Sequence, residues 1–216
     1  MAIYWINTAA SMPEFFVHWW QGLQAQSLLE LIAVITAVLY LWLAIRENIW
    51  CWFFAFISTA LSIYIFHQAT LLSESLLNVF YLVMAVYGWY QWRGGQSHNP
   101  RQIQKWPLKK HLLWITITAL FVPLLGLYTQ QYGAAYPFLD AFTSCFAVLT
   151  TILVAYKVYE NWYYWLVIDS VSMWLFWQKE LYFFTGLFAI YLIMVIIGII
   201  QWSKSYDRQS AQITRH

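Results

Sequence analysis

Apolar segments long enough to cross a lipid bilayer recur seven times along this sequence. A membrane-spanning helix needs about 20 mainly apolar residues to cross roughly 30 Å of hydrocarbon. Segments of suitable length and composition cover residues 28–45, 49–66, 71–92, 112–128, 136–156, 162–177 and 181–202. Because hydrophobic residues make up 62 % of the chain and charged residues only 9 %, a water-exposed globule is excluded. The sequence predicts an all-α integral membrane protein with seven transmembrane helices.

The basic residues are distributed asymmetrically around these segments. Ten of the 11 Lys and Arg follow the first, third, fifth or seventh segment, and only Lys179 lies between the sixth and the seventh. Because short basic loops stay in the cytoplasm, we expect a multi-pass protein of the cell's inner membrane with its N-terminus outside and its C-terminus in the cytoplasm. The basic loop 94–111 is expected to lie near anionic membrane lipid, and no nucleic acid partner is expected.

One stretch near the middle of the chain returns near its end. At an offset of 110, Tyr81, Leu82, Met84, Gly88, Gln91 and Trp92 match Tyr191, Leu192, Met194, Gly198, Gln201 and Trp202. At an offset of 113, Glu47, Asn48 and Trp52 match Glu160, Asn161 and Trp165. The chain therefore contains two copies of a three-helix unit. Basic residues follow the first and third segments of both copies, so the repeats are parallel and the fourth segment is a linker helix, in a 3+1+3 arrangement.

This arrangement divides the chain into six parts. Residues 1–27 form an N-terminal segment in which Ser11, Pro13 and Glu14 indicate the start of a short interfacial helix. Residues 28–93 form the first three-helix repeat, and residues 94–111 form a cytoplasmic loop. Residues 112–135 form the linker helix and an outer loop, residues 136–203 the second three-helix repeat, and residues 204–216 a cytoplasmic tail.

The sixth segment has the most polar centre of the seven. Asp169 lies several residues from either end, where an acid costs about 2.5 to 3.5 kcal/mol on insertion scales, so it should face a cavity or a partner helix. Ser170, Trp174 and Trp177 share the helix face beside it. Such a face can stack on a flat heteroaromatic ring. The alternatives are an interhelical hydrogen bond for Asp169 and lipid contact or packing for the tryptophans. At the offset of 113, the first copy has Phe56, Ile57, Leu61 and Tyr64 in these places.

The third segment offers a second candidate face. Asn78 and Tyr81 lie along one stripe of this helix, and Asn78 is the only amide in the interior of any span. An amide at that depth needs a polar partner, which is either a ligand or a neighbouring helix. Gln178 and Tyr182 flank the turn after the sixth segment, where both a lid over the site and an interfacial anchor fit the pattern.

Asn48 and Asn161 each follow a Glu and precede the second segment of a repeat, with Trp52 and Trp165 one turn further on. The conservative interpretation of both asparagines is helix capping at the membrane boundary. The sequence contains no Walker lysine motif, no metal-ligand spacing and no nucleophile motif. We therefore expect no catalytic residue, no metal and no cofactor, and the protein is not expected to be an enzyme.

The chain resembles the PnuC-type nicotinamide riboside transporters over nearly its whole length. The resemblance rests on the parallel repeats with a linker span, on the WxxW motif from Trp174 to Trp177, and on Asp169 five positions before it. It implies a SWEET-like homotrimer that carries nicotinamide riboside by uncoupled facilitated diffusion, drawn inward by a cytoplasmic riboside kinase. The candidate faces described above then predict a substrate site that includes Asp169, Ser170, Trp174, Trp177, Gln178, Asn78, Tyr81 and Tyr182. The resemblance implies an inner gate that includes Asn48, Trp52, Asn161 and Trp165.

Two other functions remain open at this point. Related carriers on the same frame are thought to transport thiamine or other vitamins such as riboflavin, so the site is first a site for a heteroaromatic vitamin. A seven-helix receptor or a membrane enzyme with Asp169 as its acid or base belongs to a different class. An enzyme would need a second catalytic group at membrane depth, and the sequence has only Glu30, Asp140 or Glu74 near the boundaries.

Overall fold

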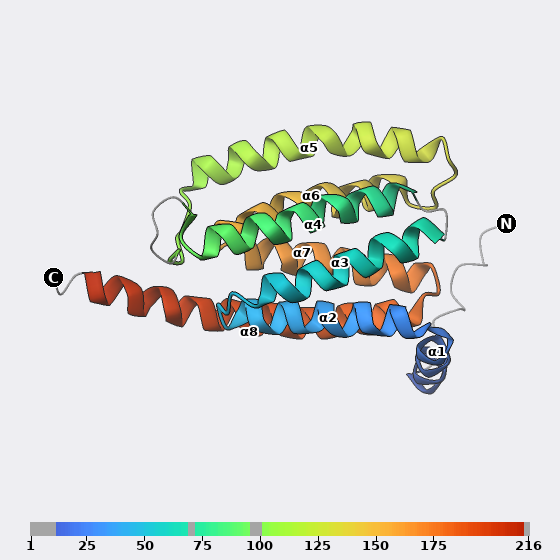
Figure 1. The fold of residues 1–216 in the computed structure, drawn as a ribbon. Helices are drawn as coiled ribbons and strands as arrows, with labels where there is room; N and C mark the ends of the chain where they lie inside the picture. Colours follow the sequence, from blue (N-terminus) through green and yellow to red (C-terminus); the bar gives the residue numbers. More distant parts are fainter. Residues whose placement is uncertain (1–11, 69–71, 96–100, 214–216) are drawn as a thin grey trace.

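The computed structural model describes residues 12–68, 72–95 and 101–213 (Figure 1). Within these ranges the chain forms eight α-helices. Their bounds are α1 (Met12–Ala25), α2 (Leu28–Ile45), α3 (Cys51–Gln68), α4 (Leu72–Trp92), α5 (Leu108–Gln130), α6 (Pro137–Ala155), α7 (Asn161–Gln178) and α8 (Tyr182–Ile213). Seven of them lie side by side, and each starts within four residues of a segment expected from the sequence. The prediction of an all-helical membrane protein is confirmed.

Five helices, namely α2, α3, α5, α6 and α8, are long and apolar enough to cross a membrane by length and composition. The other two long helices, α4 and α7, do not meet that criterion over their described residues, and both carry polar residues, including Asn78 in α4 and Asp169 in α7. Polar side chains in membrane helices usually face the interior of the bundle. The two candidate faces proposed from the sequence therefore lie on α4 and α7, the two long helices that composition alone does not identify as spans.

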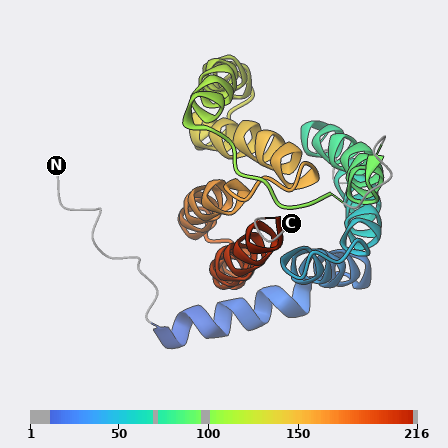
Figure 2. The same cartoon turned by 90° about the vertical axis from the view of Figure 1, so that its left-hand side faces the viewer.

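Six helices form a closed ring. Helices α2, α3 and α4 contact one another in succession, as do α6, α7 and α8, and the ring closes where α4 meets α6 and α2 meets α8. Figure 2 shows the ring viewed along its axis, with the helices seen nearly end-on. Helix α5 lies outside the ring and packs against α6. The three-helix groups correspond to the two sequence repeats, and α5 takes the place of the linker helix.

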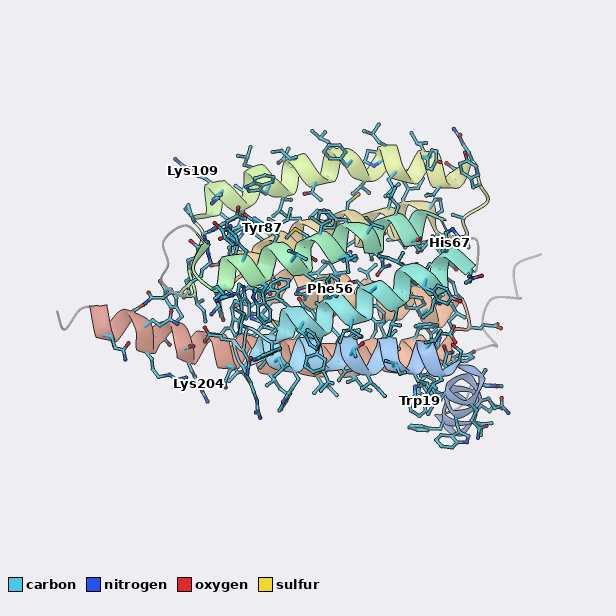
Figure 3. The ribbon with its side chains drawn as sticks, viewed as in Figure 1. Trp19, Phe56, His67, Tyr87, Lys109 and Lys204 are labelled. Atoms are coloured by element: carbon cyan, nitrogen blue, oxygen red, sulfur yellow. The ribbon has the colours of Figure 1, made fainter. Side chains whose placement is uncertain are left out.

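The two ends of the ring differ in charge, and we name them accordingly. Figure 3 shows Lys109 and Lys204 at one end, which we call the basic end, and Trp19 and His67 at the other, which we call the α1 end. Helix α1 lies crosswise to the ring at the α1 end and packs on α8, with the Trp19 ring over Gly186. Phe16 and Trp20 remain exposed on it. This is the geometry that an amphipathic interfacial helix requires.

Helices α2 and α6 end in the same way, at positions that match at the offset of 110. Glu47 and Lys157 adopt φ values of 55° and 49°, and the residues after them donate to Leu43 O and Leu153 O, each at 2.9 Å. A residue in the left-handed conformation closes a helix in this manner, normally as Gly, because other residues are strained there. Helix α7 ends in the same way at Glu180, with a φ of 58°, so this strained turn is built three times from non-glycine residues.

The close contacts of α3 and α7 correct one part of the sequence alignment. A Cβ atom on Gly88 would lie 2.3 Å from the Trp52 ring, and one on Gly198 would lie 2.6 Å from the Trp162 ring. Trp52 therefore corresponds to Trp162, not to Trp165, and the offset of 113 for the second helices is wrong. The turns that precede α3 and α7 have equal length, so the offset of 110 holds throughout. The counterpart of Asp169 is accordingly Thr59, not Phe56.

Two segments at the basic end differ from a simple loop and tail. Helix α8 continues to Ile213, well into the expected tail. Residues before α5 run along the turn between α6 and α7, where Gln104 accepts from Tyr159 N at 2.9 Å and donates to Lys157 O at 3.0 Å. Burial first, and then the hydrogen bond with Tyr163, raises the pKa of the Tyr159 hydroxyl from its ordinary value of 10.0 to about 12.

Candidate functional site

A cavity of about 280 Å³ lies inside the ring, and all six ring helices contribute to its wall. Its lining is mainly apolar and aromatic, with a few polar groups. The lining residues are Ala37, Tyr40 and Leu41 of α2, Trp52, Ala55, Ser58 and Thr59 of α3, Tyr81 of α4, Thr151 of α6, Trp165 and Asp169 of α7, and Phe188, Tyr191 and Val195 of α8. A mainly apolar concave space with a few polar groups is the usual form of a small-molecule site.

Among the described residues, Asp169 is the one acid on the wall of this cavity. It is only 5 % exposed, and its carboxyl group has no hydrogen-bond partner within the described part of the chain. A buried carboxyl normally has partners, because leaving it unpaired costs free energy. Asp169 is therefore free to bind a ligand in the cavity, as an acceptor or as a countercharge.

Three tyrosine hydroxyls add further unpaired polar groups to the cavity wall. Tyr81 of α4 and Tyr191 of α8 are counterparts at the offset of 110 and face the cavity from the two repeats. Tyr40 joins them from α2. Among the described residues, none of the three hydroxyls forms a side-chain hydrogen bond. The cavity thus combines aromatic faces, which stack on flat or cationic rings, with polar groups that still lack partners.

Four of the residues singled out from the sequence lie on this wall: Asp169, Tyr81, Trp52 and Trp165. Asn78 lies one turn from Tyr81 toward the α1 end, and its amide donates to Glu74 O at 2.9 Å. Ser170 is exposed and donates to Leu166 O. Trp174 is 46 % exposed and packs edge-on against Tyr136 at 5.7 Å between ring centroids. The shared face of Ser170 and Trp174 thus lies outside the cavity.

A separate aromatic cluster at the α1 end holds the remaining site candidates. Trp177 stacks on Phe15 of α1 at 5.6 Å and meets Tyr182 edge-on at 5.5 Å. Tyr182 also stacks on His18 of α1 at 5.5 Å. Gln178, beside them, is exposed. These residues therefore join α1 to the turn between α7 and α8.

The two asparagines assigned to the gate have different surroundings. Asn48 is exposed, and its Oδ1 accepts from Trp50 N at 3.0 Å, which caps the start of α3. Asn161 is the first residue of α7 and fully buried, and its amide donates to Val158 O at 2.6 Å. At the offset of 110 the counterpart of Asn161 is Cys51, so the two asparagines are not equivalent. Capping describes Asn48, as expected.

Sequence reasoning missed several cavity residues, most clearly Tyr40, Thr59 and Tyr191. The sequence repeat could have identified two of them, Tyr191 and Thr59. Tyr191 is the repeat counterpart of Tyr81, which had been selected, and Thr59 would have been found by carrying the offset of 110 through α3. Tyr40 has no such signal, because it lies among other apolar residues in the most hydrophobic part of α2.

Four buried tryptophans close the ring between the cavity and the basic end. Trp52 meets Trp92 edge-on at 5.6 Å, Trp92 meets Trp202 at 6.2 Å, and Trp202 meets Trp162 at 5.4 Å. Each is at most 4 % exposed. The row crosses from the first repeat to the second, since Trp52 and Trp92 have Trp162 and Trp202 as their counterparts. We call these residues the tryptophan row.

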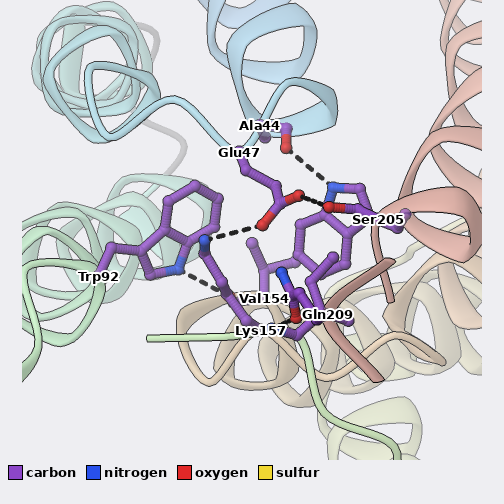
Figure 4. A network of polar contacts seen from close by, with 9 residues as sticks. Ala44, Glu47, Trp92, Val154, Lys157, Ser205 and Gln209 are labelled. Carbon is purple, nitrogen blue, oxygen red and sulfur yellow. Dashed lines mark hydrogen bonds and ion pairs between the residues drawn. The ribbon is translucent and has the colours of Figure 1, made fainter. Parts of the chain in front are cut away.

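Polar contacts join the repeats beside the tryptophan row (Figure 4). Trp92 donates its indole N–H to Val154 O, and Trp202 donates to Ala44 O, each at 3.1 Å. The two bonds are counterparts at the offset of 110. Lys157 Nζ lies 3.1 Å from Glu47 Oε2 and 4.6 Å from the centre of the Trp92 ring, while Ser205 donates to the other Glu47 oxygen.

Comparisons with known proteins agree with this architecture. The sequence profile described as "Nicotinamide mononucleotide transporter" matches residues 27–204. Nicotinamide riboside transporter PnuC of Escherichia coli (strain K12) is 25 % identical over 217 residues, covering 88 % of this chain and 91 % of that protein. Its namesake in Neisseria mucosa is 25 % identical over 204 residues, covering 86 % and 76 %.

A solved structure shares the fold. The crystal structure of the vitamin B3 transporter PnuC aligns over 90 % of both chains with a TM-score of 0.68 at 19 % sequence identity. The profile match spans most of the chain, and the family is one of transporters, so the receptor and enzyme alternatives are set aside. This multi-pass membrane protein, which is not an enzyme, belongs to the PnuC transporter family.

Proposed function

We propose that this protein carries nicotinamide riboside across the cell's inner membrane through the cavity inside the helix ring. The observation that carries the proposal is the unpaired Asp169 on an aromatic wall to which all six ring helices contribute. Nicotinamide riboside joins a flat cationic pyridinium ring to a ribose with several hydroxyls. Tyr81 and Tyr191 offer faces for the cation, and Asp169 and the tyrosine hydroxyls offer partners for the ribose.

In this proposal all seven long helices span the membrane, as two parallel three-helix repeats joined by α5. The basic end faces the cytoplasm and the α1 end faces outward, since basic residues gather at the former. Lys179 near the α1 end is paired with Asp140 at 2.9 Å, which lowers the cost of a basic residue on the outer side. The N-terminus is then outside and the C-terminus is cytoplasmic.

Transport is proposed to be uncoupled facilitated diffusion, drawn inward by a cytoplasmic riboside kinase that traps the product. Proteoliposomes provide the test. We expect purified protein to take up labelled nicotinamide riboside until inside and outside concentrations are equal, with the same initial rate when ionophores dissipate all gradients. Accumulation above equality, or loss of uptake with the ionophores, would contradict the uncoupled mechanism.

Another heteroaromatic vitamin is the second candidate, because an aromatic wall with one acid also suits the cationic thiazolium of thiamine. A thermal-shift series with nicotinamide riboside, thiamine and riboflavin separates the candidates, since only a ligand of the folded protein raises the melting temperature. Stabilisation by thiamine or riboflavin alone would replace the proposed substrate. Light scattering of the detergent-solubilised protein tests the homotrimer that the family resemblance suggests.

A further inference from the structure

We propose that the Glu47–Lys157 ion pair and the tryptophan row are the closed gate at the basic end of the cavity, and that both must part for a ligand to leave. This inference rests on the proposed function, because it assigns the exit of the same cavity. It differs from the gate expected around Asn48 and Asn161, which lie beside these residues but hold caps and local bonds.

The ion pair joins the two repeats at equivalent positions. Glu47 lies two residues after the end of α2, and Lys157 lies two residues after the end of α6, in the same left-handed conformation. Their side chains are 20 % and 9 % exposed, respectively. A charge with so little solvent depends on its partner. If the repeats separate at the basic end, both charges must become hydrated. Water from the cytoplasm would reach them in that open state.

The tryptophan row blocks the path between the cavity and the basic end. Trp52 belongs to both structures, because it lines the cavity and contacts Trp92 of the row. The two reciprocal bonds from Trp92 to Val154 O and from Trp202 to Ala44 O cross the same interface as the ion pair. Each of these bonds, like the ion pair, holds one repeat to the other.

Two buried donors remain unpaired in the closed arrangement. The indole N–H groups of Trp52 and Trp162, which are counterparts, have no hydrogen-bond partner within the described residues. A buried donor without a partner raises the free energy of the state that contains it. Entry of water on opening would hydrate both groups, so they offset part of the cost of breaking the ion pair. The ion pair thus favours the closed gate, and hydration of the two indole N–H groups favours opening.

A native cysteine reports on this gate. Cys51, the first residue of α3, is 0 % exposed and sits next to Trp52. Its thiol should react with a maleimide only when the basic end opens, because labelling of a buried group follows its opening equilibrium. The other cysteine, Cys145, is removed from every variant by Cys145→Ser. The reaction rate in lipid nanodiscs then measures gate opening without any ligand, so failure of nicotinamide riboside transport leaves the test intact.

We expect Glu47→Gln to raise the labelling rate of Cys51 about tenfold or more, as loss of one closing contact should. The matched control is Asp140→Asn, which removes the carboxylate that pairs with Lys179 at the opposite end, and it should leave the rate unchanged. The double exchange Glu47→Lys with Lys157→Glu should bring the rate back toward that of the unaltered pair. Both exchanges are conformationally mild, because each residue type already occupies the equivalent left-handed position.

Two outcomes would overturn the assignment: equal labelling in Glu47→Gln and Asp140→Asn, or labelling in the double exchange as fast as in Glu47→Gln. Size-exclusion profiles and melting temperatures establish that each variant is folded. If Glu47→Gln does not fold, Trp202→Phe replaces it, because that change removes the bond to Ala44 O and leaves the ion pair in place. It should also raise the labelling rate, and an unchanged rate would count against the gate.

Discussion

Asp169 of α7 and Thr59 of α3 occupy equivalent positions of the two repeats and face the same cavity. One is an acid without a hydrogen-bond partner among the described residues. The other is a hydroxyl that donates to Ala55 O at 2.8 Å within its own helix. The cavity between the two similar repeats therefore has an acid on the α7 side only. A ligand with one cationic ring has one preferred orientation there, because only one side offers a negative charge.

The acid should dominate ligand affinity. We expect Asp169→Asn to raise the Kd for nicotinamide riboside by about 10- to 100-fold, because hydrogen bonds to a charged group contribute roughly 1.5 to 3 kcal/mol. Isothermal titration of the purified protein measures this change. Asp140→Asn is the control, since Asp140 lies outside the cavity and pairs with Lys179. Equal affinity of Asp169→Asn and the parent would remove Asp169 from the site.

The contribution of the WxxW motif can be separated from that of the cavity wall. Trp174 packs against Tyr136 on the surface of α7, so we expect Trp174→Ala to weaken binding less than Asp169→Asn does. Stacking contributes only about 0.5 to 1.5 kcal/mol per aromatic pair. The same titration decides the matter. A larger loss in Trp174→Ala would mean that this side chain turns toward the ligand when it binds, as the sequence-based expectation requires.

Two glycines should matter for stability rather than for binding. In Gly88→Ala and Gly198→Ala the new methyl groups would clash with the rings of Trp52 and Trp162. Overpacking of this kind costs about 1 to 3 kcal/mol, which lowers Tm by roughly 2 to 4 °C per kcal/mol in a domain of this size. Thermal unfolding in detergent measures the shift for each variant.

Matched controls for the glycines lie on the same helices. Val86 and Ile196 are also repeat counterparts, and they are 60 % and 50 % exposed on the outer surface of the ring. Val86→Ala and Ile196→Ala should change Tm much less than the glycine substitutions. A glycine variant as stable as its control would show that the indole rings can move aside at no cost.

The ion pair at the α1 end should contribute little. Lys179 and Asp140 have side chains that are 28 % and 36 % exposed, and pairs with such access to solvent contribute at most about 1 kcal/mol. We expect Lys179→Met to shift Tm by no more than a few degrees and to leave uptake unchanged. A large loss of stability would mean that the pair is screened from water by the membrane surface or by a second subunit.

Helix positions followed from the sequence because the bilayer fixes the length of a span and basic residues mark its ends. The bounds of α2 coincide with the expected segment, and those of α7 differ by one residue at each end. Asp169 and Tyr81 were also found, since a polar or repeated residue inside an apolar segment is conspicuous. Those signals can be recognised in the sequence without knowing how the helices pack.

Other parts of the site depend on which face of each helix turns inward, and the sequence did not determine this. Ser170 directly follows Asp169 and was expected beside it in the site, yet only Asp169 reaches the cavity. The alignment at an offset of 113 failed for a related reason: a shared Glu-Asn dipeptide outweighed the packing of Trp52 and Trp162 on glycines. Packing between helices, which no local pattern records, decided both cases.

The opposite charges of Glu47 and Lys157 indicate when the ion pair arose relative to the duplication of the three-helix unit. Two identical three-helix proteins paired around a twofold axis would place the same residue at both positions, either two acids or two bases in contact. An attractive pair can arise there only after duplication, when the two positions are inherited separately. The ion pair at the basic end is therefore younger than the duplication, and a half-length ancestor must have held its two subunits together by other means.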